Sequence, residues 1–378
     1  MKRVVWTLWM FVGLGVAACA DTAVPPSTPQ ALRVAGSKLT VPVVMSSVGG
    51  LAEDNTVVGL AASEDGQKAF PVVWPVGEAV ERLAVSEKST NASALAISGN
   101  GDVAGMYMSQ ELPMGPVRWA PSESAAVPVE MESLGGALTL VRGMNAQGAA
   151  VGSSQTQKQE VPHAVRWDRS GAVTDLGVLP GFDVSGAFGI NDKGVVVGQS
   201  GVTDRVGRPV RWDPDGTLTE LALPAGTRSG TANAVNHAGA VVGTAGPEKA
   251  LGALADPGDT DVQAVLWKPD GTVHPLPAPG GAASEAWDIN RSGDVVGAFL
   301  RPGGSMRAVR WSRDGAPVEL RPLQGDTVSF ARAVNDRGYV AGDSMDDEGR
   351  TRAVLWHPDG SVTPLDRHIV PSRPTPRD

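Results

Sequence analysis

The chain repeats a pattern of short apolar runs separated by turn residues, with a period of about 45 residues. Each repeat holds four runs rich in Val, Ile, Leu and Trp, and the clearest copy covers residues 187–221. None of the runs has the length or the 3.6-residue period of an amphipathic helix. Seven copies align along the chain. The pattern therefore predicts four short β-strands in each of seven repeats.

Two positions of the repeat keep the same residue type in all seven copies. The third run carries a tryptophan, at Trp74, Trp119, Trp167, Trp212, Trp267, Trp311 and Trp356. The second run closes on a glycine, at Gly59, Gly105, Gly152, Gly198, Gly243, Gly297 and Gly342. Packing roles recur from copy to copy, so we assign the tryptophans to the contacts between neighbouring repeats.

The turn between the first and second runs has its own signature, which is clearest at Asn191–Gly194. Asn opens the turn and Gly occupies the position that needs a positive φ, which is typical of a type I turn with a glycine bulge. The glycine recurs at Gly101, Gly148, Gly194, Gly239, Gly293 and Gly338. In the first copy the position is Asn55, the type of residue that best tolerates this conformation after glycine. Ala52 and Ser98 replace the opening Asn in the first two copies.

A four-stranded unit cannot bury both of its faces alone, so the copies must stack on one another. Radial stacking of small antiparallel sheets gives a propeller. We therefore expect an all-β fold, a seven-bladed β-propeller of four-stranded antiparallel blades over residues 40–367, followed by a tail at 368–378. The alternative is an open β-solenoid of the same repeats. That fold would need capping segments at its ends, and the sequence has no distinct segment of this kind.

The N-terminus has the pattern of a targeting segment. Lys2 and Arg3 precede an apolar stretch that is too short to span a bilayer comfortably and that ends in small residues directly before Cys19. This junction resembles the lipobox of bacterial lipoproteins. The resemblance implies a signal peptide at 1–18, cleavage before Cys19, a diacylglyceryl thioether on its sulfur and a proline-rich linker at 19–39. We expect a lipid-anchored protein of the bacterial cell envelope, at the outer membrane or the cell surface; an ordinary secretory signal with an incidental cysteine is the alternative.

The charge balance narrows the range of partners. The chain has a formal net charge of −9, and loss of Lys2 and Arg3 with the signal peptide would make it more negative. A nucleic acid or an anionic membrane surface would favour the opposite sign. We expect a monomer that meets the membrane only through its lipid and that binds an unidentified protein or carbohydrate. Cys19 is the only cysteine, so the chain contains no internal disulfide.

Residues 164–168, 174–181 and 189–198 resemble the repeats of the HAF family of extracellular proteins, and the likeness extends over residues 45–366. The resemblance implies an extracellular, propeller-like protein and no particular reaction. The first two copies depart most from the family pattern, at Ala52 and Ser98.

Motifs for enzymatic chemistry are nearly absent. The chain contains no HExxH, GxSxG, P-loop or CxxC pattern. Residues 99–104 fit the loose dinucleotide pattern GxGxxG/A, but they fall at a predicted hairpin turn with no helix after it to hold a pyrophosphate. The five histidines occupy unrelated positions of the repeat, which does not indicate a metal site. We therefore assign no cofactor, metal or catalytic residue.

The fifth copy carries an insertion at residues 247–261 with three aspartates, Asp256, Asp259 and Asp261. Carboxylates in a loop that contains glycine can bind calcium, but their spacing is not that of an EF-hand loop. We interpret the insertion as a solvated acidic loop and leave calcium as the alternative.

One position of the first run varies freely, three residues before the Asn column. It holds Gly49, Leu95, Arg142, Phe188, Asn233, Trp287 and Arg332. Packing roles repeat with the blade, whereas a binding site on a propeller axis needs different groups from different blades. The candidate ligand contacts are Arg142, Phe188, Asn233, Trp287 and Arg332, with Glu285 and Asp288 beside Trp287. The alternative is that these side chains only fill an irregular channel.

Two functions remain open. The first is a non-enzymatic binding scaffold; the second is a propeller hydrolase or lyase that acts on extracellular glycans with axial carboxylates. Glycoside cleavage needs two carboxylates about 5–9 Å apart. Glu285 and Asp288 lie near the predicted axis without an obvious partner, so the sequence favours binding.

Overall fold

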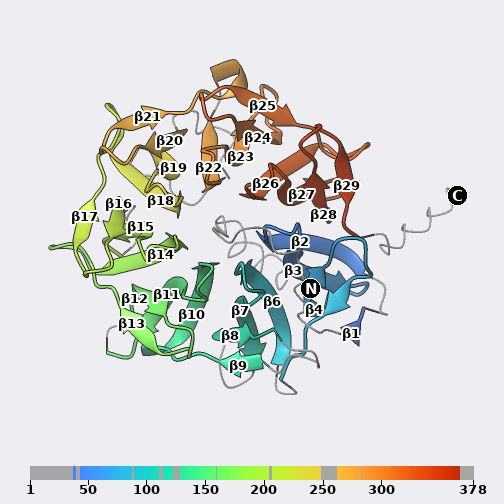
Figure 1. Cartoon of the computed structure of the whole chain (residues 1–378), viewed down its shortest axis with the longest axis horizontal. Helices are drawn as coiled ribbons and strands as arrows, with labels where there is room; N and C mark the ends of the chain where they lie inside the picture. The colour runs from blue at the N-terminus through green and yellow to red at the C-terminus, as the bar shows by residue number, and fades with distance from the viewer. Residues whose placement is uncertain are drawn as a thin grey trace, which may run out of the picture.

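The computed structural model describes residues 37–39, 43–86, 89–109, 114–121, 128–158, 160–203, 207–247, 262–281 and 283–366. Seven antiparallel sheets stand around a ring, and one short 3₁₀ turn lies at Pro279–Gly281 (Figure 1). The predicted seven-bladed propeller is confirmed. The open solenoid is wrong, because Val48 and Val57 of the first sheet share a core cluster with Ala333 and Leu355 of the last.

Four predicted features lie outside these residues: the signal peptide, Cys19, the insertion beyond Pro247 and the C-terminal tail at 368–378. Within the described ranges, no helix is long and apolar enough to cross a membrane.

Each blade consists of four strands that are consecutive in the chain. Blade 1 is formed by β2 Val43–Leu51, β3 Val57–Ser63, β4 Ala69–Trp74 and β5 Glu81–Arg82. Blade 2 is formed by β6 Ser89–Ile97, β7 Val103–Ser109, β8 Gly115–Trp119 and β9 Pro128–Glu130. Blade 3 is formed by β10 Gly135–Met144, β11 Ala150–Thr156, β12 Pro162–Trp167 and β13 Val173–Asp175. Blades 4 and 5 are formed by β14 Val184–Ile190, β15 Val196–Gly201, β16 Arg208–Trp212, β17 Leu218–Glu220; and β18 Ser229–Val235, β19 Val241–Gly246, β20 Gln263–Trp267, β21 Val273–Pro275. Blades 6 and 7 are formed by β22 Ser284–Ile289, β23 Val295–Leu300, β24 Met306–Trp311, β25 Pro317–Leu320; and β26 Val328–Val334, β27 Val340–Met345, β28 Thr351–Trp356, β29 Val362–Pro364. In addition, β1 Ser37–Lys38, within the predicted linker, pairs with β5 and adds a fifth strand to blade 1.

The first strand of every blade lies nearest the centre of the ring (Figure 1). Each of these strands contains a β-bulge at the same point. In blade 4, Ala187 pairs with Gly198 and Gly189 pairs with Val197, so Phe188 is the extra residue. The extra residues of the seven blades are Gly49, Leu95, Arg142, Phe188, Asn233, Trp287 and Arg332. The freely varying position of the sequence is therefore the bulge of each innermost strand, and we call these seven residues the axial ring.

The bulge also explains the complete glycine column. The column glycine pairs with the residue just before the bulge, where the two strands come very close. A Cβ on Gly198 would lie 1.9 Å from the carbonyl oxygen of Gly186. A Cβ on Gly152 would lie 1.8 Å from that of Leu140. Any side chain would collide with the neighbouring backbone, so every copy has glycine here.

The predicted turn chemistry is confirmed. Gly194 has a φ of 80°, and Asn55, which replaces glycine in blade 1, has a φ of 72°. The other column glycines also have positive φ, at Gly101, Gly148, Gly239, Gly293 and Gly338.

The Asn column has a second role that links the blades. Asn191 Oδ1 accepts a hydrogen bond from Val195 N within the turn, and Asn191 Nδ2 donates to the carbonyl of Asn236 in blade 5, 2.9 Å away. The same inter-blade bond is donated by Asn145, Asn236, Asn290 and Asn335. In blade 2, Ser98 supplies only the turn acceptor, and Asn100 Nδ2 donates to Ala146 O instead. We call this series of inter-blade bonds the Asn ladder. Because the bond needs a side-chain N–H donor, the turn opens on asparagine rather than aspartate.

The column tryptophans are buried between neighbouring blades, as predicted. Trp119 of blade 2, for example, packs with Val58 and Val73 of blade 1. Its indole N–H donates to the carbonyl of Ala84, just after the last strand of blade 1. Trp167, Trp267, Trp311 and Trp356 make the matching bond to the preceding blade. We call this bond the tryptophan clasp.

The ring closes without exchange of a strand between its first and last blades. Side chains join the two blades instead. Asp343 of β27 accepts hydrogen bonds from Ser47 Oγ and Val48 N of β2, at 3.0 and 2.9 Å. The Trp74 indole donates to Asp366, which follows the last strand of blade 7.

Candidate functional site

The residues of the axial ring lie between neighbouring innermost strands. Their side chains are largely buried, from 4% exposed at Trp287 to 8% at Asn233. In blade 1 the bulge is Gly49, where a Cβ would lie 2.2 Å from the carbonyl oxygen of Ala94 in blade 2. The bulges at Gly49 and Asn233 thus face the first strand of the next blade.

The structure brings Trp287 and Arg332 together. The guanidinium carbon of Arg332 lies 5.5 Å from the Trp287 ring centroid and 5.7 Å from that of Phe330. Arg332 Nε also donates to Asp343 Oδ2 at 2.6 Å, and both side chains of this ion pair are almost fully buried. The two aromatic rings lie 5.9 Å apart. This cluster joins a charge pair to two aromatic faces, which stabilises the buried cation.

Arg142 and Phe188 form a second pair, in blades 3 and 4. The guanidinium carbon of Arg142 lies 6.0 Å from the centroid of the Phe188 ring. Burial of Arg142 lowers the pKa of its guanidinium to about 10 because the charged form is removed from water. The group still carries a positive charge at neutral pH. Blade 2 places Leu95 at the same position, so the fold does not require a cation there.

The other predicted ligand contacts, Asn233, Glu285 and Asp288, form hydrogen bonds within the protein. Asn233 Nδ2 donates to the carbonyl of Ala286 at 2.8 Å, across to blade 6. Glu285 Oε2 accepts from Trp287 Nε1 at 2.9 Å. Asp288 is fully buried and accepts from the N–H groups of Ile289 and Val334. The carboxylate of Asp288 therefore ties blade 6 to blade 7.

Sequence reasoning did not single out Phe330 and Asp343. The two residues pair across β26 and β27, directly beside the bulge at Arg332. A signal for Asp343 does exist, because it follows the column glycine and is the only acidic residue at that position among the seven copies. Phe330 carries no comparable signal, since its role depends on the neighbouring Trp287.

No group of three or more His, Cys, Asp or Glu side chains that could hold a metal ion occurs in the described part of the chain.

The chain matches no protein-family model and no curated protein sequence. Membership in the HAF family therefore stays a prediction.

Solved structures with the same fold include several enzymes. Puromycin hydrolase superposes with a TM-score of 0.59 at 12% identity, over 94% of this chain and 58% of its own. The acylaminoacyl peptidase of Pyrococcus horikoshii gives 0.54 at 15% identity, over 86% of this chain and 52% of its own. The present chain thus spans little more than half the length of either enzyme.

The β-propeller domain of the Trilobed protease from Pyrococcus furiosus, which has an open velcro topology, is similar over its whole length. It gives a TM-score of 0.59 at 14% identity and covers 86% of this chain. At such identities the likeness concerns the fold alone: the chain is a seven-bladed β-propeller.

Proposed function

We propose that the protein is a non-enzymatic binding module of the bacterial cell envelope and that the axial ring is its recognition surface. The observation that carries this proposal is the burial of Arg142. Removal of an arginine from water is unfavourable, and Leu95 in blade 2 occupies the same position without that cost. Since the fold does not need a cation at this position, we assign the charge of Arg142 to recognition.

The chemistry of the ring favours an anionic group on the ligand. Arg142 and Arg332 each lie over an aromatic ring near the centre of the propeller, and the net charge of the whole chain is negative. Guanidinium groups pair with carboxylates and phosphates through short, charge-assisted hydrogen bonds. The ligand is an envelope protein or a carbohydrate that bears such a group.

The proposed location rests on the N-terminal sequence. A lipid on Cys19 would hold the propeller on a membrane, and the proline-rich linker 19–39 would separate the two. The propeller would then act as a monomer displayed at the surface or in the periplasm.

The enzymatic alternative has less support. A glycan hydrolase or lyase needs carboxylates that are available to substrate. Asp288 accepts two backbone hydrogen bonds, and Glu285 accepts one from Trp287. The fold shared with puromycin hydrolase carries no information on activity at this identity.

The test uses the full chain on a glycan and peptide array, followed by titration of the strongest binder. Arg142→Leu, which copies blade 2, should weaken binding by the folded protein at least tenfold, about 1.4 kcal/mol. The control is Arg208→Leu, a matched change at a partly exposed arginine of β16. Full affinity in Arg142→Leu would refute the axial site.

A further inference from the structure

One interface of the ring lacks the tryptophan clasp. The indole N–H of Trp212 in blade 4 is buried and has no hydrogen-bond acceptor among the described residues. Its counterpart acceptor would be the carbonyl of Gly177, after the last strand of blade 3. That carbonyl instead accepts from Ser185 Oγ at 2.7 Å, and Gly177 has a φ of 76°. The Gly177 carbonyl thus bonds to Ser185 of blade 4 and not to the indole of Trp212.

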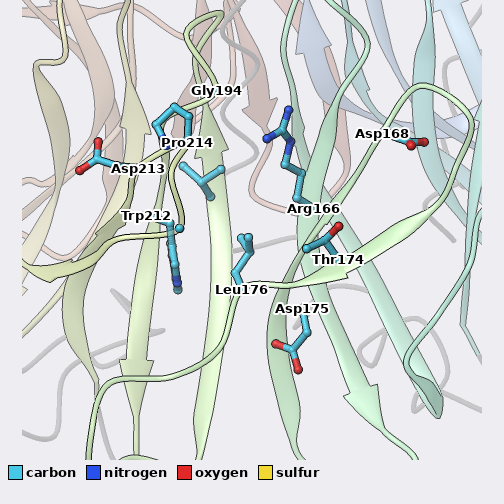
Figure 2. Close-up of a pocket in the computed structure, with 11 residues that line it drawn as sticks. Arg166, Asp168, Thr174, Asp175, Leu176, Gly194, Trp212, Asp213 and Pro214 are labelled. Carbon is cyan, nitrogen blue, oxygen red and sulfur yellow. The ribbon is translucent and has the colours of Figure 1, made fainter.

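A pocket of about 290 Å³ lies at this same interface. Figure 2 shows Trp212 and Pro214 of blade 4 on one side, with Arg166, Thr174 and Leu176 of blade 3 on the other. The indole nitrogen of Trp212 is directed away from the Gly194 turn, whereas the guanidinium of Arg166 lies closer to it. The apolar side chains of Leu176 and Pro214 line the pocket, and the Arg166 guanidinium lies toward the Gly194 turn.

Arg166 is also an exception within its own column. The residue before the column tryptophan is an arginine in blades 2, 3, 4 and 6. Arg118, Arg211 and Arg310 form ion pairs with Asp102, Asp213 and Asp294 at 2.7, 2.6 and 2.9 Å. Arg166 makes neither a hydrogen bond nor an ion pair with any residue that the structure describes.

Two differences explain why Arg166 lacks a partner. Blade 3 has Ala149 at the turn position where blades 2 and 6 have Asp102 and Asp294. Asp168, which corresponds to the partner of Arg211, accepts hydrogen bonds from Ser170 N, Ser170 Oγ and Ala172 N in its own turn. Arg166 therefore lacks both of the partners that the equivalent arginines use.

The groups at the pocket define the ligand chemistry. Arg166 is the only basic residue among those that line the pocket, and the Thr174 hydroxyl beside it can donate or accept a hydrogen bond. The carboxylates that line the pocket already have partners in the protein. Asp175 lies 2.9 Å from His163 Nδ1, and Asp213 forms an ion pair with Arg211. A ligand that pairs with Arg166 must bring acceptor oxygens, and a carboxylate can pair with a planar guanidinium through two parallel hydrogen bonds.

We propose that the pocket between blades 3 and 4 binds a small, elongated carboxylate, with its charged group on Arg166 and its apolar chain against Leu176 and Pro214. This site is separate from the axial ring and does not depend on the function proposed above.

The test uses the full chain labelled with ¹⁵N, in which Trp212→Phe assigns the Trp212 indole N–H signal. The probes are hexanoate, benzoate and N-acetylglycine, each titrated to about 50 mM, since a ligand of this size binds in the millimolar range. At least one should shift the Trp212 signal in a saturable way. Hexanamide, which has the shape of hexanoate without its charge, should bind at least tenfold more weakly.

Two variants complete the test. Arg166→Gln should weaken binding at least tenfold. Ala149→Asp, which restores the partner found in blades 2 and 6, should do the same while the protein stays folded. The control is Ala240→Asp, the same change at the matching turn of blade 5, which should bind as the wild type does. A folded wild type that none of the three carboxylates shifts would overturn the proposal, as would full affinity in Arg166→Gln and Ala149→Asp.

Discussion

The indole N–H of Trp74 in blade 1 donates to Oδ1 of Asp366 in blade 7, at 2.7 Å. At the other clasped interfaces the acceptor is a backbone carbonyl of the preceding blade, as with Trp119 and Ala84. At the closing interface a buried carboxylate takes the place of that carbonyl. One of the bonds that close the ring therefore rests on a side chain that a single substitution can remove.

Replacement of Asp366 by alanine should lower the free energy of unfolding by about 1.5–3 kcal/mol, the range for a hydrogen bond to a charged group. Urea denaturation measures the change. In a Trp74→Phe background the same replacement should have a much smaller effect, because the donor is already absent. Additive effects of the two changes would show that the bond does not link the blades.

Two glycines four residues apart should respond differently to alanine. Gly194→Ala meets no close atom and only strains the backbone at a φ of 80°, so it should cost about 1–2 kcal/mol. Gly198→Ala would place a Cβ 1.9 Å from the carbonyl oxygen of Gly186 and should cost about 3 kcal/mol or more. Thermal and urea unfolding compare the two variants. An equal loss in both would contradict the bulge geometry.

The Asn ladder can be tested by an isosteric change. Asn191→Asp keeps the turn acceptor for Val195 N but removes the donor to the Asn236 carbonyl and places two oxygens in opposition. We expect a loss of about 1–3 kcal/mol. Asn100→Asp, which removes the substitute bond from blade 2 to the carbonyl of Ala146 in blade 3, should behave in the same way. Lys193→Val, on the surface of the same turn, is the control and should have little effect.

Stability should fall in acid through the exposed turns. Hydrogen bonds from the hydroxyl groups of Ser170, Thr272 and Ser361 hold the pKa values of Asp168, Asp270 and Asp359 below their ordinary value of 3.8. A lowered pKa in the folded state means that the stabilisation is complete above this value and is lost as pH falls through the folded pKa.

Melting temperatures measured from about pH 6 down to about pH 2.5 would test this dependence. The triple variant Asp168→Asn, Asp270→Asn, Asp359→Asn should show a shallower decline below pH 4 than the wild type. Identical slopes would mean that other carboxylates control acid unfolding.

The repeating frame could be predicted from sequence because each of its roles recurs seven times. The tryptophan column and the positive-φ turn, with its exception at Asn55, were readable from residue type alone. The bulge was not, because it depends on the register between two strands. The sequence therefore located the varying position but could not show that Trp287 lies on Phe330 and Arg332.

That packing also changes one expectation. The sequence assigns Trp287 to ligand contact and Trp311 to the core, so that only loss of Trp311 should destabilise the protein. Trp287 is 4% exposed and belongs to a cluster with Ala298 and Met306. Truncation of either tryptophan should therefore destabilise the fold by about 3–5 kcal/mol.

The inter-blade pocket could not have been found from the repeat. Trp212 and Arg166 fit their columns, and the exception arises from the carbonyl direction of Gly177 and from Ala149, which looks unremarkable in sequence. A break in a repeated hydrogen bond is visible only when all the copies are compared in three dimensions.

Because each blade is built from consecutive strands, the ring does not determine which blade comes first in the chain. Strand β1 and Asp366 both contact blade 1, through β5 and through Trp74. A short peptide that joins these two points, with new termini between Ala225 and Gly226 in the loop from β17 to β18, would give a circular permutant in which every sheet stays intact. Such a permutant should fold to the same ring, since the closing interface would become an ordinary internal connection and the interface between blades 4 and 5 would keep its clasp, Trp267 to Ala222.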